Sequence, residues 1–312
     1  MDVIHFPDDP RPAWWHQPVL AFGNFDGLHR GHTKIIERVR RRAEERAGVA
    51  VALTFDPHPT HVVRPDKAPK LLMTKAQKLE ALQAEGMDGV AIVRFTPDLS
   101  QWGPEEFVTR VLVDWLHVTE VWVGANFLFG HDRAGTFSLL RLLGVRHGFR
   151  AEKISPVRYK DFVVSSTRIR RLVAEGRVDE AAAFLGRHYA LDATVVEGSR
   201  RGRELGFPTA NLVTANELLP PNGVYATFLL LDGAIHASVT NVGVRPTFDG
   251  GPTTVVETHV FDLDRDLYGR PARLAFVQRL RAERRFESAG ALREQIAADC
   301  RHARALFDRL SL

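Results

Sequence analysis

The segment 23-GNFDGLHRGH-32 combines two histidines with several glycines after a short apolar run. Glycine lets a backbone turn tightly or approach a ligand closely. Because the histidines stand where a helical pattern begins, free backbone amides and the positive end of the helix dipole would attract an anion there. His29 and His32 could then stabilise charge at a phosphorus atom under attack. A metal pair or an ordinary capped surface turn would use the same residues, and this segment alone leaves those alternatives open.

Three other segments carry polar residues of the kinds that bind or catalyse: 55-FDPHP-59, 124-GANFLFG-130 and 164-VSSTRIRRL-172. The hydroxyl groups of Ser165, Ser166 and Thr167 stand at the start of a helical pattern, where their ordinary use is to cap the helix. His61 follows Asp56 by five residues, a spacing that favours a metal pair only weakly. These segments gain meaning only if the fold brings them together.

Between about residues 19 and 185, valine-rich apolar runs alternate with amphipathic stretches. The apolar runs are 19-VLAF-22, 49-VAVALTF-55, 90-VAIVRF-95 and 121-VWVG-124, and the amphipathic stretches predict helices at 32–47, 75–86 and 104–117. This alternation predicts a parallel sheet covered on both faces, with ligands beyond the carboxyl ends of its strands. The four polar segments, the last after an expected strand at 161–164, would then meet on one edge as a single site.

After residue 186 the pattern changes to short, β-branched, closely spaced segments at 189–198, 223–233, 234–243 and 253–263. Asp232-Gly233, between two of them, is a strong hairpin signal. These features predict a small antiparallel β-barrel, and a helical pattern at roughly 288–308 predicts a terminal helix. The sequence therefore predicts an α/β protein with two domains, 1–185 around the parallel sheet and 186–312 around the barrel.

The first part of the barrel region offers candidates for phosphate and metal chemistry. Glycines at positions 198, 202 and 206 could let a loop fold over phosphates, although spaced glycines also occur in plain turns. Thr209 and Asn211 offer hard oxygen atoms of the type that Mg²⁺ prefers. Local turn chemistry after Pro208 would explain the same two residues, so their pattern alone does not choose.

The second part of the barrel region offers a candidate base. Glu257 lies in the strand pattern 255-VVETHV-260 and could accept a proton from a hydroxyl nucleophile, or simply face solvent. Arg279 and Arg281 could approach flavin or phosphate, or belong to a solvated charged face. The chain has no GxxxxGK[ST] motif, so a kinase built on this sequence cannot be a P-loop enzyme.

The composition excludes several classes of protein. The 312 residues are 45% hydrophobic and 26% charged, as in a globular chain, with a net charge of +4. The single cysteine, Cys300, excludes an intrachain disulfide and a CxxC zinc site. The first twenty residues lack a signal-peptide core, and no run approaches the ~18 apolar residues that span a bilayer. We therefore expect a cytoplasmic protein with no membrane partner.

The motif GNFDGxHxGH after a first strand, followed later by SSTxxR at a helix start, resembles the HxGH nucleotidyltransferases. Both halves occur here, as 23-GNFDGLHRGH-32 and 165-SSTRIR-170. The resemblance implies a Rossmann-like domain in which His29 and His32 act on the adenylyl transition state. It also implies ATP contacts by Gly23, Asn24, Phe25, Asp26, Gly31, Ser165, Ser166, Thr167 and Arg170.

The second half is similar to a flavokinase domain in the order of its motifs, which include 198-GSRRGRELGFPTANL-212, 241-NVGVRPTF-248, 257-ETHVFD-262 and 276-FVQRLRAERRFES-288. From about residue 19 to 300 the chain resembles bacterial bifunctional riboflavin kinase/FMN adenylyltransferases, also called FAD synthetases. The resemblance implies that ATP and riboflavin give FMN and ADP, and that ATP and FMN then give FAD and pyrophosphate. The partners would be riboflavin, FMN and ATP, with no nucleic acid.

The same resemblance implies individual roles around the kinase reaction and the flavin. Glu257 would be the base that activates the riboflavin 5′-hydroxyl, and Thr209 and Asn211 would bind Mg²⁺. The kinase loop would contact its nucleotide through Gly198, Gly202, Gly206 and Pro208. Flavin contacts would come from His58, Asn126, Arg279 and Arg281.

The adenylyltransferase half departs from the family pattern, which commonly reads VGxDFxFG with a downstream RxGDF. Here Ala125 and Leu128 bring less polarity, Asn126 keeps a polar side chain, and Thr136 replaces an acidic residue. These changes leave open a kinase whose adenylyltransferase half has lapsed. A flavin-binding regulator that contacts RNA is a further alternative, although the arginines are scattered without interleaved aromatic residues. The sequence does not predict the oligomeric state.

Overall fold

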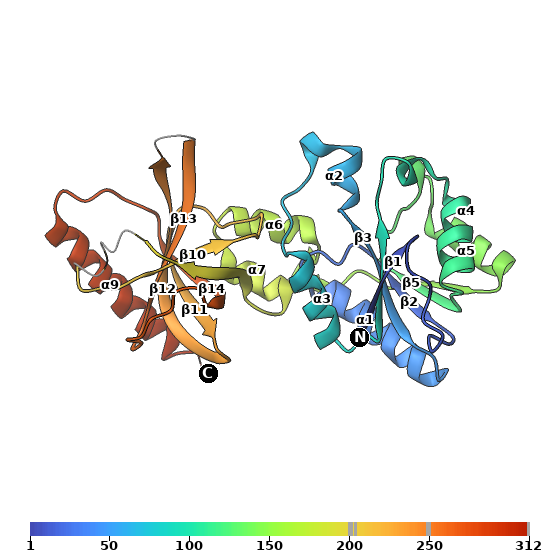
Figure 1. Cartoon of the computed structure of the whole chain (residues 1–312), viewed down its shortest axis with the longest axis horizontal. Helices are drawn as coiled ribbons and strands as arrows, with labels where there is room; N and C mark the ends of the chain where they lie inside the picture. The colour runs from blue at the N-terminus through green and yellow to red at the C-terminus, as the bar shows by residue number, and fades with distance from the viewer. Residues whose placement is uncertain (199–201, 203–204, 248–250, 311–312) are drawn as a thin grey trace. The chain divides into compact units, whose positions relative to one another are not determined.

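The structure, a computed structural model, describes residues 1–198, 202, 205–247 and 251–310 (Figure 1). Residue contacts divide the chain into two compact units. The first unit comprises Met1–Lys70 and Lys75–Ser166, and the second comprises Leu71–Thr74 and Thr167–Leu312. Parts of two kinase motifs, at residues 199–201, 203–204 and 248, lie outside the described residues. The predicted domain boundary near residue 185 remains a prediction.

The first unit contains the predicted parallel sheet. Its strands follow the order β1-β4-β3-β2-β5-β6, and every neighbouring pair is parallel. The strands are β1 (Asp2–Phe6), β2 (Val19–Phe22), β3 (Ala50–Asp56), β4 (Gly89–Arg94), β5 (Glu120–Val123) and β6 (Arg150–Lys153). The sequence pattern missed β1 and β6, because edge strands are polar or half-exposed and lack the continuous apolar run of a central strand.

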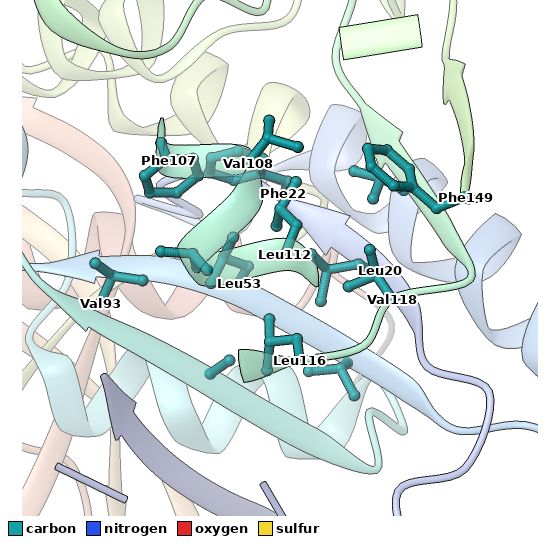
Figure 2. Packing of buried hydrophobic residues seen from close by; sticks show 14 of the residues in the cluster. Leu20, Phe22, Leu53, Val93, Phe107, Val108, Leu112, Leu116, Val118 and Phe149 are labelled. Carbon is teal, nitrogen blue, oxygen red and sulfur yellow. The ribbon is translucent and has the colours of Figure 1, made fainter. Parts of the chain in front are cut away.

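Helices cover both faces of this sheet (Figure 1). Helix α1 (Arg30–Glu45) packs on β2 and β3 from one side. On the other side, a core cluster joins Leu20 and Phe22 of β2 to Leu112 and neighbouring side chains (Figure 2). That side is formed by α4 (Pro104–Phe107), the π-helical η3 (Val108–Trp115) and α5 (Phe137–His147).

Short elements and a longer helix complete the first unit. They are α2 (Pro59–Val63), η1 (Pro65–Lys67), α3 (Lys75–Ala84), η2 (Leu99–Gln101) and η4 (His131–Arg133). The strand expected at 161–164 does not join the parallel sheet. It is β8 (Phe162–Val163), which pairs with β7 (Arg158–Tyr159) in a separate antiparallel hairpin. Its exposed side chains explain the error, because a central strand would be buried.

Helices α6 (Ser166–Ala174) and α7 (Val178–Leu185) precede the predicted barrel of the second unit. The barrel is closed and antiparallel, in the order β10-β13-β12-β11-β14-β9. Its strands are β9 (Tyr189–Val196), β10 (Ala210–Thr214), β11 (Gly223–Leu231), β12 (Ala234–Thr247), β13 (Gly251–Val260) and β14 (Pro271–Arg281). Asp232 and Gly233 form the predicted hairpin turn, with φ of 51° and 80°. Such left-handed values are typical of a two-residue hairpin.

Alternation along the barrel strands separates an inner from an outer face. The inner face carries apolar side chains and a fully buried set of hydroxyls that bond to one another: Thr227, Ser238, Thr240 and Thr258. On the outer face, the terminal helix α9 (Ala289–Phe307) packs against Val224, Val239 and Val277. Among the described residues, no helix combines the length and apolarity needed to cross a membrane.

Candidate active sites

The first candidate site lies where three adjacent strands of the parallel sheet end. Strands β3, β2 and β5 are neighbours, and the polar segments predicted to meet follow directly after them. Asn24 Nδ2 lies 3.2 Å from His58 Nε2, so the first and second segments touch. The ring of Phe127 meets Phe22 at the end of β2, with centroids 4.7 Å apart. The structure therefore brings the three segments to one edge of the sheet.

The turn after β2 has an unusual backbone. Phe25 and Leu28 have positive φ values of 51° and 35°, and Gly27 between them has a φ of 81°. Left-handed backbone is costly for bulky residues, so the surroundings must hold it in place. Phe25 is fully buried, and its ring packs edge-on against the His32 imidazole at 5.3 Å. Burial of Phe25 therefore fixes the turn beside the histidines.

His29 and His32 form a stacked pair at the start of α1. His29 is the N-cap of the helix, and its Nδ1 accepts a hydrogen bond from the His32 amide at 3.3 Å. The two rings are 3.7 Å apart and nearly parallel, at 11°. A Cβ atom on Gly31 would stand 3.1 Å from the His29 ring. A larger residue at position 31 would therefore crowd the His29 imidazole, which would have to shift slightly.

The SSTRIR segment reaches the same turn through its second serine. Ser166 Oγ donates a hydrogen bond to the backbone oxygen of Asp26 at 2.8 Å. Helix α6 begins at Ser166, and Thr167 and Arg170 follow within it, in the second unit. Ser165 directly precedes the helix. Contact with the turn is therefore seen for Ser166, whereas the nucleotide contacts of Ser165, Thr167 and Arg170 remain predictions.

The structure accounts for one departure from the family pattern. Thr136 is the N-cap of α5, and its hydroxyl accepts a hydrogen bond from the Leu139 amide at 3.2 Å. Threonine caps a helix as an acidic residue can, so the local helix start is kept. Asn126 and Leu128 are both exposed on the segment after β5. The reduced polarity at Leu128 therefore lies at a surface and leaves the core unchanged.

Two residues of this edge were not singled out from the sequence. Thr54, near the end of β3, is buried and donates to the backbone oxygen of Asn24 at 3.2 Å. Lys78 of α3 in turn donates to the Thr54 hydroxyl at 3.4 Å. Burial lowers the pKa of Lys78, against the opposing pull of Asp26 and Asp56. The sequence carried one signal for Lys78, since it stands four residues before the apolar Leu82 and therefore on the same face of the expected helix.

Asp56 and His61, which their spacing weakly favoured as a metal pair, each have another partner in the structure. Asp56 pairs with Lys75 at 2.9 Å, and His61 Nε2 contacts the backbone oxygen of Pro69 at 3.2 Å. Among the described residues, no group of three or more His, Cys, Asp or Glu side chains could hold a metal ion. Asp56 and His61 thus each contact a residue other than the partner that a metal pair would give them.

The second candidate site lies on the outer face of the barrel. A Cβ atom on Gly198 would overlap the side-chain amide of Asn211, which is only 8% exposed. A Cβ atom on Gly202 would overlap the backbone oxygen of Phe207 and stand 3.1 Å from Thr209 Oγ1. Glycine is therefore needed at positions 198 and 202, because the backbone at these two residues lies directly against Asn211 or close to Thr209, the predicted metal ligands. Gly206 differs, since its φ of 85° explains glycine without any close neighbour.

Strand register brings Glu257 to the same face. Glu257 of β13 is directly opposite Asn211 of β10 on one side and Asn241 of β12 on the other. Directly opposite residues share a face, with Cβ atoms about 5 Å apart. His259, two residues further along β13, donates from Nδ1 to the backbone oxygen of Pro208 at 2.8 Å. The PTAN and ETH motifs, whose nearest residues are 46 positions apart, thus meet across one strand pair.

The two arginines of β14 have different surroundings. Arg279 donates from Nη2 to the backbone oxygen of Asn222 at 2.7 Å. Arg281 forms a bidentate ion pair with Asp299 of α9, with contacts of 2.8 to 3.1 Å. The guanidinium of Arg281 thereby ties α9 to the barrel. A flavin contact by Arg281 would have to replace or share this ion pair.

Comparison with known proteins gives matches over both halves of the chain. A family model described as FAD synthetase matches residues 12–168, and one described as riboflavin kinase matches residues 185–307. A Pseudomonas fluorescens protein named bifunctional riboflavin kinase/FMN adenylyltransferase is 40% identical over 288 residues, which are 92% of each chain. The Escherichia coli K12 protein of the same name is 35% identical over 290 residues, 93% of this chain and 92% of that protein.

A solved structure shares the fold over nearly the full length. A crystal structure titled as a macrolide-efflux protein from Streptococcus pneumoniae superposes with a TM-score of 0.87 at 26% identity. The match covers 97% of this chain and 99% of that one. The sequence relatives and the fold relative thus both extend across the two units.

Proposed function

The chain belongs to the family of bifunctional riboflavin kinase/FMN adenylyltransferases, and on that premise we propose how its residues divide the two reactions. The enzyme converts riboflavin and ATP to FMN and ADP, and then FMN and ATP to FAD and pyrophosphate. The two sets of candidate catalytic residues lie in different units of the chain, which supports the proposed division of the reactions. The stacked histidines lie in the first unit, whereas Glu257 and Asn211 lie in the second.

For adenylyl transfer, we place the ATP phosphates at the start of α1. A phosphate oxygen of FMN attacks the α-phosphorus, the bond to the bridging oxygen breaks, and pyrophosphate leaves. His29 and His32 donate to oxygens of the α-phosphate, where negative charge builds up in the transition state. The amides at the helix start add fixed positive potential. The ATP contacts proposed around them are Gly23, Asn24, Phe25, Asp26, Gly31, Ser165, Ser166, Thr167 and Arg170, and His58 and Asn126 would contact FMN.

For the kinase reaction, we propose Glu257 as the general base. Its carboxylate accepts the proton of the riboflavin 5′-hydroxyl as the oxygen attacks the γ-phosphorus of ATP, and ADP leaves as the terminal bond breaks. The register that sets Glu257 opposite Asn211 supports this role, because it places the base on the same face as Asn211, against which Gly198 lies. Gly198, Gly202, Gly206 and Pro208 would line the nucleotide, and Arg279 and Arg281 would be the flavin contacts on β14.

Mg²⁺ is the metal that we propose for this site. The hydroxyl of Thr209 and the amide oxygen of Asn211 are hard donors of the type that Mg²⁺ prefers, and the backbone at Gly202 and Gly198 lies close to them. The donor set therefore fits the ion, with Thr209 and Asn211 as the residues that would hold it. When bound, Mg²⁺ would neutralise part of the charge on the ATP phosphates.

Because Cys300 is the one cysteine of the sequence, we propose the reducing cytoplasm as the compartment in which the protein works.

Chromatography of flavins tests the whole proposal. The purified chain is incubated with riboflavin, ATP and Mg²⁺, and the flavins are separated over time. We expect FMN to appear first and FAD to replace it. Accumulation of FMN alone would contradict the adenylyl site proposed at His29 and His32. Riboflavin that stays unchanged, with the protein folded, would contradict the kinase site.

A further inference from the structure

Lys78 is a basic residue at the edge of the adenylyl site that none of the recognised motifs includes. It lies on α3 and is half-buried, one helical turn before the fully buried Leu82. Lysine is rarely turned inward, because burial of its ammonium costs free energy unless charges and acceptors compensate. The half-buried ammonium of Lys78 therefore indicates that this lysine does more than keep the protein surface hydrated.

The contacts of Lys78 lead to the turn that we assign to ATP. The ammonium donates a hydrogen bond to Thr54 Oγ1 at 3.4 Å, and the Thr54 hydroxyl donates its own hydrogen bond to the backbone oxygen of Asn24 at 3.2 Å. Thr54 is only 2% exposed, so its hydroxyl group is shielded from water. Asn24 in turn contacts His58. A chain of side chains thus runs from α3 through β3 to the turn.

Charge supports the same conclusion. The Asp26 carboxylate is 2% exposed and lies within the turn, where a buried negative charge would repel a triphosphate. The charged groups facing Lys78 are Asp26 of the turn, Asp56 at the end of β3 and Lys75 of its own helix. Burial lowers the pKa of Lys78, the two carboxylates oppose that shift, and Lys75 adds to it. Asp56 also pairs with Lys75 at 2.9 Å, and Asp26 exerts the stronger pull of the two carboxylates on Lys78.

We propose that Lys78 is a positioning residue for adenylyl transfer: it holds the backbone of Asn24 through Thr54 and balances the charge of Asp26 beneath the triphosphate. This inference rests on the proposed placement of ATP at the turn. A turn that loses either support would move the stacked histidines relative to the α-phosphate. A misplacement of about 1 Å near a reacting group can cost a factor of about 100 in rate.

The test uses the full chain with Lys78→Met, Lys78→Arg and Thr54→Val, and with Lys75→Met as the matched control. FMN adenylylation and riboflavin phosphorylation are measured on the same samples, so the kinase reaction reports folding of the chain. We expect Lys78→Met to lower kcat/KM for adenylylation about 100-fold, and Thr54→Val to lower it less, both with normal phosphorylation. Lys75→Met should change adenylylation by less than about threefold, because exposed ion pairs contribute little.

A pH profile separates positioning by charge from a purely structural role. Because the pKa of Lys78 is lowered, the wild type should lose adenylylation kcat/KM as pH rises through a range below that of an ordinary lysine. Arginine stays protonated, so Lys78→Arg should retain its activity across that range. Identical alkaline profiles for the wild type and Lys78→Arg would overturn the proposal, as would wild-type adenylylation in Lys78→Met.

Two further results keep the test decisive. If Lys78→Met does not fold, the pH comparison between the wild type and Lys78→Arg decides alone. His32→Ala tests the placement of ATP separately. If His32→Ala retains full adenylylation while Lys78→Met loses it, the placement of ATP fails and the need for Lys78 stands. If the reverse is found, the ATP site stands and the role of Lys78 fails.

Discussion

The two candidate sites are built by opposite means. In the first unit, loops after three adjacent parallel strands supply the site, and the turn holding Asn24 depends on left-handed backbone at Phe25 and Leu28. In the second unit, strand register sets Glu257 opposite Asn211 on a closed barrel. Side chains on paired strands are fixed by many ladder hydrogen bonds, whereas a turn needs local contacts such as Ser166 with Asp26. We therefore expect activity at the first site to depend strongly on the contacts that hold the turn. Activity at the second site should depend mainly on the side chains that take part in the reaction, such as Glu257 and Asn211.

The largest expected effect separates the two reactions completely. Glu257→Gln removes the base with almost no change of shape, so FMN formation should fall by a factor on the order of 10² to 10⁴. Conversion of supplied FMN to FAD should continue at the wild-type rate. Steady-state assays of each half-reaction measure both. Wild-type kinase activity in this variant would remove Glu257 from the role of base.

The converse change is His32→Ala. Loss of one preorganised donor to a charged transition state costs a factor of about 100 to 1,000 in rate. FAD formation from supplied FMN should fall by that factor, and riboflavin phosphorylation should not change. Phe25 packs on the His32 ring, so part of the loss could come from the turn. His32→Gln, which keeps a donor and much of the volume, should therefore recover some activity. Equal loss in both reactions would contradict the separation of the sites.

Glycine substitutions compare the crowding at the two sites. Gly198→Ala would push the buried amide of Asn211 aside, and we expect about 100-fold slower phosphorylation. Gly31→Ala meets the His29 ring at 3.1 Å, a milder contact, and should slow adenylylation about 10-fold. Gly290→Ala and Gly103→Ala are the respective controls, since neither meets a close neighbour. A greater loss in Gly31→Ala than in Gly198→Ala would reverse this comparison.

The smallest expected effect is on stability, and it tests whether the ion pair of Arg281 and Asp299 holds α9 to the barrel. Asp299→Asn leaves the guanidinium with a weaker acceptor in a largely buried setting, which should lower the free energy of unfolding by about 2 kcal/mol. The exposed pair of Arg304 and Asp262 gives the control, and Arg304→Gln should cost less than about 1 kcal/mol. Thermal or urea unfolding of each full-length variant measures the difference. Equal effects would show that Arg281 and Asp299 do not tie α9 to the barrel.

Local patterns identified much of the first unit. Valine-rich runs with intervening amphipathic stretches predicted the central parallel strands, and the parallel arrangement itself predicted one edge for the segments at 23–32, 55–59 and 124–130. The sequence analysis did not predict the edge strands β1 and β6, because their residues are polar or half-exposed like those of a protein surface. The segment 161–164 looked like another central strand, but lies in an exposed hairpin. Burial, which a short sequence window does not contain, decides between those outcomes.

By itself the sequence determined the residue types of both sites and the order of the elements that carry them, because backbone propensity and motif spacing act along the chain. Only the tertiary structure decided which of these residues meet. Glu257 faces Asn211 through barrel register, and Arg281 binds Asp299 of a helix 18 residues away. Lys78 contacts Thr54, which is 24 residues away, and Thr54 contacts Asn24 of the turn, which is a further 30 residues away. Such contacts depend on register and on buried charge, which emerge when distant segments pack.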